Sequence, residues 1–163
     1  VISDTAVGIG KVPEAQLDVR GDIIGGCPVY FQRTAGQNTA TNTTFNFNRV
    51  AVSKGGGWDN TSRFYAPIAG YYHISFSCMS TFNEGVHAFR FRKNGSDHPG
   101  NNEDARVYGY IQPTGIDSRT YMRLAGQTIM YLAVGDYMDI LNEPSTSSIH
   151  VSYNQLTGFY LSI

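Results

Sequence analysis

The stretch RFYAPIAGYYHISFS, from Arg63 to Ser77, decides the fold of this chain. Pro67 has no amide hydrogen to donate to a sheet and Gly70 tolerates positive φ, so the segment between them should be a turn between two strands. From Tyr71 onward apolar and polar side chains alternate, which is the period of a β-strand with one buried face. The side chains expected on the core face are Tyr72, Ile74, Phe76 and Cys78.

Two other stretches, TIMYLAV at Thr128–Val134 and GFYLSI at Gly158–Ile163, are apolar on both faces of the strands that they predict. An antiparallel sheet that covers a single core should leave one face polar, so the second apolar face must be buried elsewhere. A neighbouring subunit is the simplest source of that burial. In the last strand we expect Phe159, Leu161 and Ile163 on one face and Tyr160 on the other.

Length and composition limit the architecture and the partners. With 163 residues, 41% of them hydrophobic, the chain can enclose one good core, so we expect a single domain with an appendage. A formal net charge of -1 provides no electrostatic footprint for nucleic acid or for an anionic membrane. No apolar run approaches the roughly 18 residues that cross a bilayer. We therefore expect neither nucleic-acid binding nor membrane insertion.

The ends and the cysteines give further expectations. The N-terminus carries no secretory signal peptide, and the chain begins at Val1 instead of a methionine. We therefore expect a piece of a longer protein whose targeting information lies upstream. The two cysteines, Cys27 and Cys78, are too few for a disulfide scaffold, and we interpret them as free thiols in preference to a disulfide.

The histidines and carboxylates show no pattern typical of an enzyme or a metal site. The histidines are isolated in the sequence and have no metal-ligand spacing: His73, His87, His98 and His150. His98 with nearby carboxylates could hold a hard cation, but their loop is rich in Gly and Asn and needs no metal. We predict no catalytic residue, no metal and no cofactor, with paired carboxylates for sugar cleavage as an open alternative.

The organisation of the chain changes near residue 27. Residues 1–26 hold short apolar alternations broken by glycines and a proline, and cannot bury a core alone. This segment resembles one that recurs in phage tail-fibre proteins and some bacterial surface proteins, just before a C-terminal trimeric head. The resemblance predicts a shaft or neck at 1–26 and a head at 27–163, with a generic Gly-rich linker as the alternative. The matching residues are Gly8, Ile9, Gly10, Pro13, Leu17, Asp18, Val19, Gly21 and Ile23.

After Pro28, short apolar alternations are separated by turn-rich segments, and no segment has convincing helical periodicity. Many short strands at such spacing favour an all-β sandwich or barrel. The expected strands are Val29–Thr34, Phe45–Val52, Arg63–Ala66, Gly70–Thr81, Val86–Arg92, Arg106–Gln112, Arg119–Leu124 with Thr128–Val134, Tyr137–Leu141, and His150–Ile163.

Residues 45–163 resemble the globular heads of the complement C1q and tumour necrosis factor superfamily. The resemblance implies an all-β C1q/TNF-like jelly-roll sandwich that assembles as a homotrimer. Ser62 stands where the family commonly has glycine, and Met138 where a β-branched residue is frequent, so no binding residue is carried over. The matching features are the FNFNRVAV stretch, Trp58, Asp59, Phe64, Pro67, Gly70, Tyr72, Phe76, Leu132, Gly135, Asp136, Met138, Ile140, Gly158, Phe159 and Leu161.

The resemblance also orients the head. In that family the sheet with the first, third, sixth and last strands faces the threefold axis, which places Tyr71, Tyr131 and Tyr160 toward neighbouring subunits. Chain entry and exit should share one end, the base, with the Lys93–Asp104 loop. The loops expected at the far end are those around Trp58, around Asn83-Glu84, at Thr114–Ser118 and at Asn142–Ser148.

Binding residues concentrate in loops that a rigid scaffold holds in place. Trp58 has the chemistry of a sugar contact, because its aromatic face lies beside side chains that form directional hydrogen bonds. The alternative is that Trp58 packs on the sandwich, as an aromatic residue often does at this position in the family. The candidate receptor-binding residues are Trp58, Asp59, Asn60, Asn83, Glu84, Asp117 and Arg119.

Three classes of function fit these observations. We predict the trimeric C-terminal head of a phage tail fibre or similar fibre, which binds a host cell-surface receptor, a glycan by preference, through loops where trivalency multiplies weak contacts. The first alternative is a structural trimerisation and capping head of a fibre or bacterial surface stalk. The second is a secreted soluble recognition or enzymatic module. The expected location is the virion, or otherwise the extracellular space or cell surface.

Overall fold

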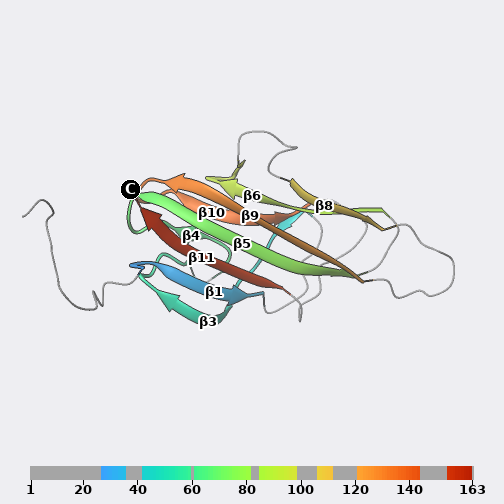
Figure 1. Ribbon diagram of the computed structural model, residues 1–163, viewed down its shortest axis with the longest axis horizontal. Helices are drawn as coiled ribbons and strands as arrows, with labels where there is room; N and C mark the ends of the chain where they lie inside the picture. Colours follow the sequence, from blue (N-terminus) through green and yellow to red (C-terminus); the bar gives the residue numbers. More distant parts are fainter. Residues whose placement is uncertain are drawn as a thin grey trace, which may run out of the picture.

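The computed structural model describes residues 27–35, 42–59, 61–81, 85–98, 106–111, 121–143 and 154–162, and the statements below refer to these residues. They form eleven strands and no helix (Figure 1). No helix in this part of the chain is therefore long and apolar enough to cross a membrane. The strands make two antiparallel sheets that pack face to face, the jelly-roll sandwich that the sequence predicts.

The first sheet has five strands in the order β3-β1-β11-β5-β9. Its longest pair is β5 with β9, which stay in register from Gly70 opposite Leu132 to Thr81 opposite Tyr121. The two segments predicted at 119–124 and 128–134 are thus one continuous strand. The strands of this sheet are β1 (Tyr30–Thr34), β3 (Arg49–Lys54), β5 (Gly70–Thr81), β9 (Tyr121–Leu132) and β11 (Gln155–Ser162).

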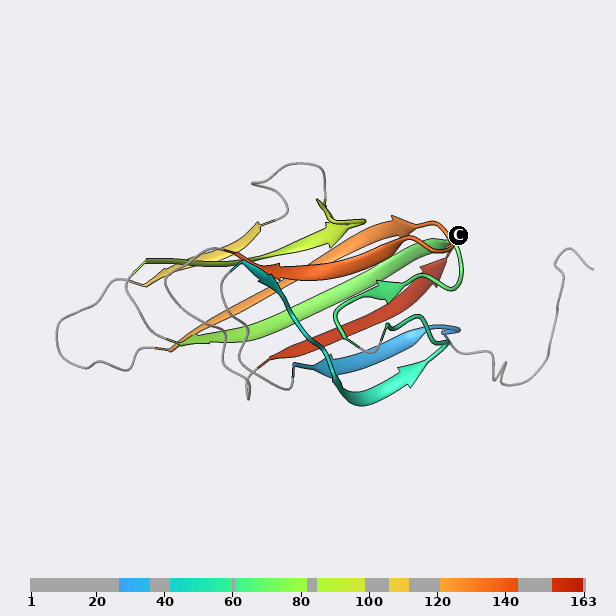
Figure 2. The ribbon, with the colours of Figure 1, turned by 180° about the vertical axis from the view of Figure 1, so that it is seen from behind.

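The second sheet lies behind the first in Figure 1 and in front of it in Figure 2. Its strands follow the order β2-β10-β6-β7, with β4 beside β10 and β8 beside β6. The strands are β2 (Thr43–Thr44), β4 (Phe64–Tyr65), β6 (Gly85–Lys93), β7 (Ser96–Asp97), β8 (Arg106–Ile111) and β10 (Tyr137–Asn142). The two-residue strands β2 and β7 were not expected from the sequence.

The strand predicted from Phe45 to Val52 is partly wrong, because this segment crosses from one sheet to the other. It leaves the second sheet after β2 and enters the first at β3 (Figure 2). The amide of Phe45 donates to the carbonyl of Ile140 at 3.0 Å, and that of Phe47 donates to Thr61 at 2.7 Å. Both rings are fully buried. The apolar alternation at 45–48 therefore belongs to a segment that closes one edge of the sandwich and is not part of a strand.

Aromatic side chains fill the space between the sheets. The predicted core face of β5 is confirmed, since Tyr72, Ile74, Phe76 and Cys78 are all buried. The Phe76 ring meets Phe45 at 4.7 Å and Phe89 at 4.9 Å, both edge to face. Burying each such ring contributes about 1.5 to 3 kcal/mol. Both cysteines are free thiols, as predicted, and burial raises the pKa of Cys78 to about 12.

The two ends of the sandwich differ in what they hold. At one end, which we call the base, β1 begins at Tyr30 and β11 ends at Ser162 (Figure 1). At the opposite end, the far end, β5 stops at Thr81 beside the start of β9 at Tyr121. The described chain therefore enters and leaves at the base, as the sequence predicts.

Candidate functional site

Trp58 lies near the base, so its predicted position in a far-end loop is wrong. β3 runs antiparallel to β1 and ends at Lys54, opposite Tyr30. The chain then turns through Gly55–Gly57, whose φ angles of 85°, 75° and 96° favour glycine. The physical reason is that β3 carries the chain back to the base before Trp58 is reached. Trp58 then pairs with Phe64 in a short antiparallel bridge.

The indole of Trp58 is partly buried and packs against the core. Its ring centroid lies 5.1 Å from Phe31, 6.0 Å from Phe47 and 5.8 Å from Phe64. The guanidinium of Arg33 stacks on the ring at 4.5 Å and donates a hydrogen bond to the carbonyl of Phe47 at 3.1 Å. Trp58 therefore packs on the sandwich, the alternative raised from the sequence, and its role as a sugar contact stays a prediction.

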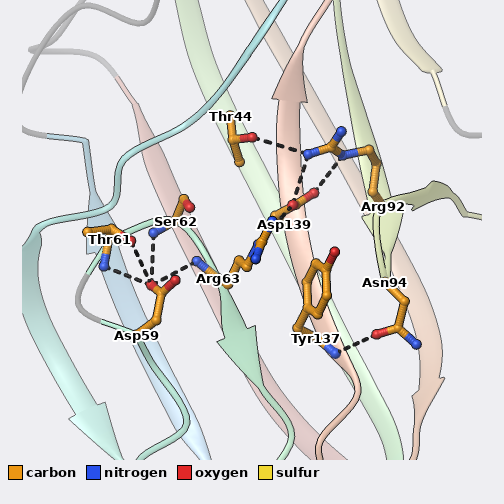
Figure 3. Close-up of polar contacts among 9 residues, drawn as sticks. All are labelled: Thr44, Asp59, Thr61, Ser62, Arg63, Arg92, Asn94, Tyr137 and Asp139. Carbon is orange, nitrogen blue, oxygen red and sulfur yellow. Dashed lines mark hydrogen bonds and ion pairs between the residues drawn. The ribbon is translucent and has the colours of Figure 1, made fainter.

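Asp59 holds the turn that follows Trp58 (Figure 3). Its Oδ1 accepts from the amides of Thr61 at 2.8 Å, Ser62 at 3.0 Å and Arg63 at 3.1 Å, and from the Thr61 hydroxyl at 3.0 Å. Burial works against ionisation, but these hydrogen bonds outweigh it and hold the pKa of the carboxyl below its ordinary value. The described contacts of Asp59 thus serve the local turn.

The other receptor-binding candidates, Asn60, Asn83, Glu84, Asp117 and Arg119, lie outside the described residues. The strands that flank four of them can still be placed. β5 ends at Thr81 and β6 begins at Gly85, which pairs with the last residue of β8, Ile111. β9 begins at Tyr121, opposite Thr81. These strand ends all lie at the far end of the sandwich.

The outward side of the first sheet carries an unusual number of exposed apolar side chains near the base. We call this set the outer apolar face. Tyr71 of β5 pairs with Tyr131 of β9, and the two rings meet at 5.3 Å. In the next row, His73 lies between Phe159 of β11 and Ile129 of β9. The members are Tyr30, Tyr71, Ile129, Tyr131, Phe159 and Leu161, each between 40% and 56% exposed.

Tyr160 does not share the orientation of Tyr71 and Tyr131. Its ring packs at 5.4 Å on the buried ring of Tyr72, whereas its neighbours Phe159 and Leu161 are exposed. The expected separation of Phe159 and Leu161 from Tyr160 is therefore confirmed, but Tyr160 is directed toward the core and Phe159 and Leu161 are the outward residues. The register of β11 against β5 also shifts between Tyr160 and Ser162, which a period of two does not foresee. Strand pairing, which places Phe159 beside Tyr30 and His73, was the missing information.

A charge network covers the outward side of the second sheet (Figure 3). Arg92 of β6 donates two hydrogen bonds, of 2.6 and 2.9 Å, to the carboxylate of Asp139 in β10. It also donates to the Thr44 hydroxyl at 3.1 Å. Arg63 lies 3.8 Å from the same carboxylate and stacks over Tyr137 at 4.5 Å. Because each carboxylate oxygen faces a guanidinium, this arrangement stabilises the sheet and offers no reactive group.

Arg90 extends this network toward β7. It pairs with Asp97 at 2.6 Å and with Glu143. The hydrogen bond to Glu143 is the main cause that raises the pKa of Arg90. Asp97 is one of the carboxylates near His98 in the sequence, and here it is the ion-pair partner of Arg90. Within the described ranges no three His, Cys, Asp or Glu side chains are grouped as a metal would need.

A second polar cluster fixes the turn between β9 and β10 at the base. Asp136 accepts from the Asn94 amide at 2.8 Å, the Lys93 ammonium at 2.9 Å and the backbone amide of Ala133 at 2.9 Å. These contacts, that of Asn94 first, lower the pKa of Asp136 to about 2. Lys93 also donates to the carbonyl of Tyr131 at 2.8 Å. The cluster therefore helps to hold Tyr131 in the outer apolar face.

Comparisons with known proteins support the fold. No model of a known protein family matches the chain, and no curated protein matches its sequence. The globular domain of zebrafish complement 1qA protein aligns at a TM-score of 0.60 and 14% identity, over 82% of this chain and 95% of that chain. Murine APRIL at pH 5.0 aligns at 0.66 and 11% identity, over 82% and 98%. Eiger TNF from S. frugiperda aligns at 0.63 and 8% identity, over 82% and 91%.

These structures are similar in fold at low sequence identity, and each is covered almost completely by the alignment. In this chain the first and last described strands, β1 and β11, are adjacent in one of the two sheets. The chain therefore has the jelly-roll fold of C1q and tumour necrosis factor-like globular domains.

Proposed function

We propose that this chain is the trimeric head of a phage tail fibre or a similar fibre, and that it binds a host cell-surface receptor, a glycan by preference, through loops at its far end. The observation that carries the proposal is the outer apolar face, because six large apolar side chains share one side of one sheet and remain exposed. A head of this kind would act on the virion or outside the cell, without catalysis.

The outer apolar face supports assembly because its exposed area is continuous across β1, β11, β5 and β9. Ile129, Tyr71 and Tyr131 are 56%, 46% and 43% exposed. Covering the rest of each of these side chains would contribute about 1 kcal/mol per residue. A homotrimer, which the resemblance to C1q and tumour necrosis factor heads implies, repeats this gain at three interfaces. The assembled head would then be more stable than the separate subunits.

The direction of the chain supports receptor binding at the far end. Cys27 and Ser162 both lie at the base, and the Cys27 thiol contacts the carbonyl of Tyr160 at 3.2 Å. A shaft at residues 1–26 would therefore join the head at the base. The strands that flank the candidates Asn83, Glu84, Asp117 and Arg119 end at the opposite side. Trp58 and Asp59 are weaker candidates, because the described contacts of both serve packing and turn geometry.

The outer apolar face also supports a second function, that of a structural head that caps the fibre and holds its chains together. It needs the outer apolar face and no receptor site. The two functions differ in whether the far end binds anything, so a binding measurement separates them.

The test is binding of the labelled protein to a panel of bacterial strains and to a glycan array. Two variants alter the far end, Asn83→Ala with Glu84→Ala and Asp117→Ala with Arg119→Ala, and Ser96→Ala near the base is the control. We expect at least one far-end variant to lose tenfold or more of the binding, because trivalency amplifies each lost contact. Sedimentation should show the same trimer in all variants. A trimer that binds no strain and no glycan would leave only the capping function.

A further inference from the structure

His73 lies inside the outer apolar face. It belongs to β5, the strand between β11 and β9, and it pairs with Phe159 on one side and Ile129 on the other. The adjacency of the three strands is visible in Figure 1. A partner that covers both Phe159 and Ile129 must therefore also cover His73. Beyond Phe159 the row continues with Tyr30 and ends at Lys54 of the edge strand β3.

The contacts of the imidazole suit its neutral form. Its ring stacks on Phe159 with centroids 4.9 Å apart and an interplanar angle of 30°. Nε2 lies 3.2 Å from Oε1 of Gln127, to which it donates when it carries the hydrogen. Nδ1 is already shielded from solvent and has no hydrogen-bond partner among the described residues. A second proton on the ring would occupy Nδ1, where the described residues provide no acceptor.

The first sheet provides no counter-charge for an imidazolium. The sequences of its five strands contain no Asp or Glu, and their charged residues are Arg33, Arg49, Lys54 and Arg123. Lys54 lies over the Tyr30 ring at 5.9 Å, on the same side of the sheet. The other titratable groups near this side are the phenols of Tyr30, Tyr71 and Tyr131 and the Lys93 ammonium, which lies 5.8 Å from the Tyr131 ring and pairs with Asp136 at 2.9 Å. His98 approaches from beyond β9, where its Nε2 lies 3.3 Å from the carbonyl of Ile129.

We propose that His73 makes the interface between subunits sensitive to pH, so that the trimer forms at neutral pH and weakens in mild acid. The inference rests on the trimer of the proposed function. Histidine changes its charge between about pH 5 and 8. A free subunit accepts the proton on His73 with the ring still partly in water. In an assembled subunit the charge would be covered within the outer apolar face, whose own strands offer it no acceptor at Nδ1 and no carboxylate. Protonation therefore favours the separate subunits.

The expected size follows from linkage. We take the covered histidine to stay neutral in the trimer. Within the pH range where histidine gains its charge, each further pH unit of acidification then lowers the association constant by up to tenfold per subunit, or up to about a thousandfold for three. The binding of protons to the dissociated subunits carries the whole effect. The same acidification should leave the fold of each subunit intact above about pH 5, where carboxylates remain ionised.

The experiment is sedimentation equilibrium of the full chain at pH 8.0 and pH 5.0, with circular dichroism to monitor the fold. We expect a trimer at pH 8.0 and dissociation at pH 5.0 at the same concentration. His73→Phe preserves the stacking and removes the proton, and His73→Gln preserves polarity, so both should be equally associated at the two pH values. His98→Gln is the matched control and should behave as the unaltered chain does.

The outcomes separate this inference from the proposed function. An unaltered chain that is equally trimeric at both pH values overturns the pH dependence and leaves the trimer in place. The inference is also overturned when both His73 variants retain the pH dependence, or when His98→Gln abolishes it. An unaltered chain that is monomeric at pH 8.0 overturns the proposed trimer itself, and the inference with it.

Discussion

Trp58 illustrates how a residue chosen for recognition can be held by packing. Its indole contacts three phenylalanine rings and one guanidinium beside the Gly55–Gly57 turn. We expect Trp58→Ala to lower the free energy of unfolding by about 2 to 3 kcal/mol, somewhat less than for a fully buried tryptophan. Urea unfolding at fixed protein concentration measures this loss.

Val50→Ala is the control for that measurement, because Val50 is 53% exposed at an edge strand and should change stability by no more than about 0.5 kcal/mol. A Trp58→Ala protein as stable as the parent, but unable to bind cells, would support the sugar-contact role instead.

Gly158 allows β11 to approach the core. A Cβ placed on it would overlap the ring of Phe31, on the neighbouring strand β1. We expect Gly158→Ala to cost about 1 to 3 kcal/mol of stability, because the ring must move within a packed interior. The double variant with Phe31→Leu should lose less than the sum of the two single losses. Additive losses would show that the two positions do not meet.

At the scale of elements, the turn between β9 and β10 gives a pH dependence that is independent of His73. The pKa of Asp136 is about 2 in the folded chain, below the ordinary value of about 3.9 for an unfolded aspartate. Stability from this group is therefore fully present above about pH 4 to 5 and is lost as the pH falls toward 2.

Asp136→Asn should accordingly be less stable than the parent at pH 6, and the difference should shrink as the pH falls to 2. Because Asp136 is partly exposed, solvent screening limits the expected difference to about 1 kcal/mol. Thermal unfolding at several pH values measures it. A constant difference across this range would mean that the negative charge of Asp136 contributes nothing to folding.

The elements also show where sequence patterns suffice. β5 could be predicted residue by residue, because Gly70 opens it and its core face repeats with a period of two from Tyr72 to Cys78. The segment 45–48 could not, because its alternation of Phe and Asn is the same for a strand and for a crossing between sheets. Strands β2 and β7 are too short to leave any periodic pattern.

For the whole molecule, the candidate site was predicted only in part. TIMYLAV correctly indicated that β9 is apolar on both faces, and Tyr71 and Tyr131 are exposed on the outward one. Strand pairing determines three features that the pattern could not supply. These are the outward position of Phe159 in place of Tyr160, the position of Trp58 near the base, and the place of His73 between two apolar neighbours. Pairing between distant segments is a property of the assembled sheets, which a single strand pattern does not contain.

The assembly itself is tested by placing a charge in the outer apolar face. Ile129→Asp puts a carboxylate at a side chain that is 56% exposed and that the proposed trimer covers. We expect this variant to sediment as a monomer at micromolar concentration and pH 8.0, because a buried charge without a partner costs several kcal/mol. Val50→Asp makes the same change at a side chain that is 53% exposed and lies outside this face, so it should remain trimeric. An Ile129→Asp trimer as stable as the parent would place the subunit interface on another surface.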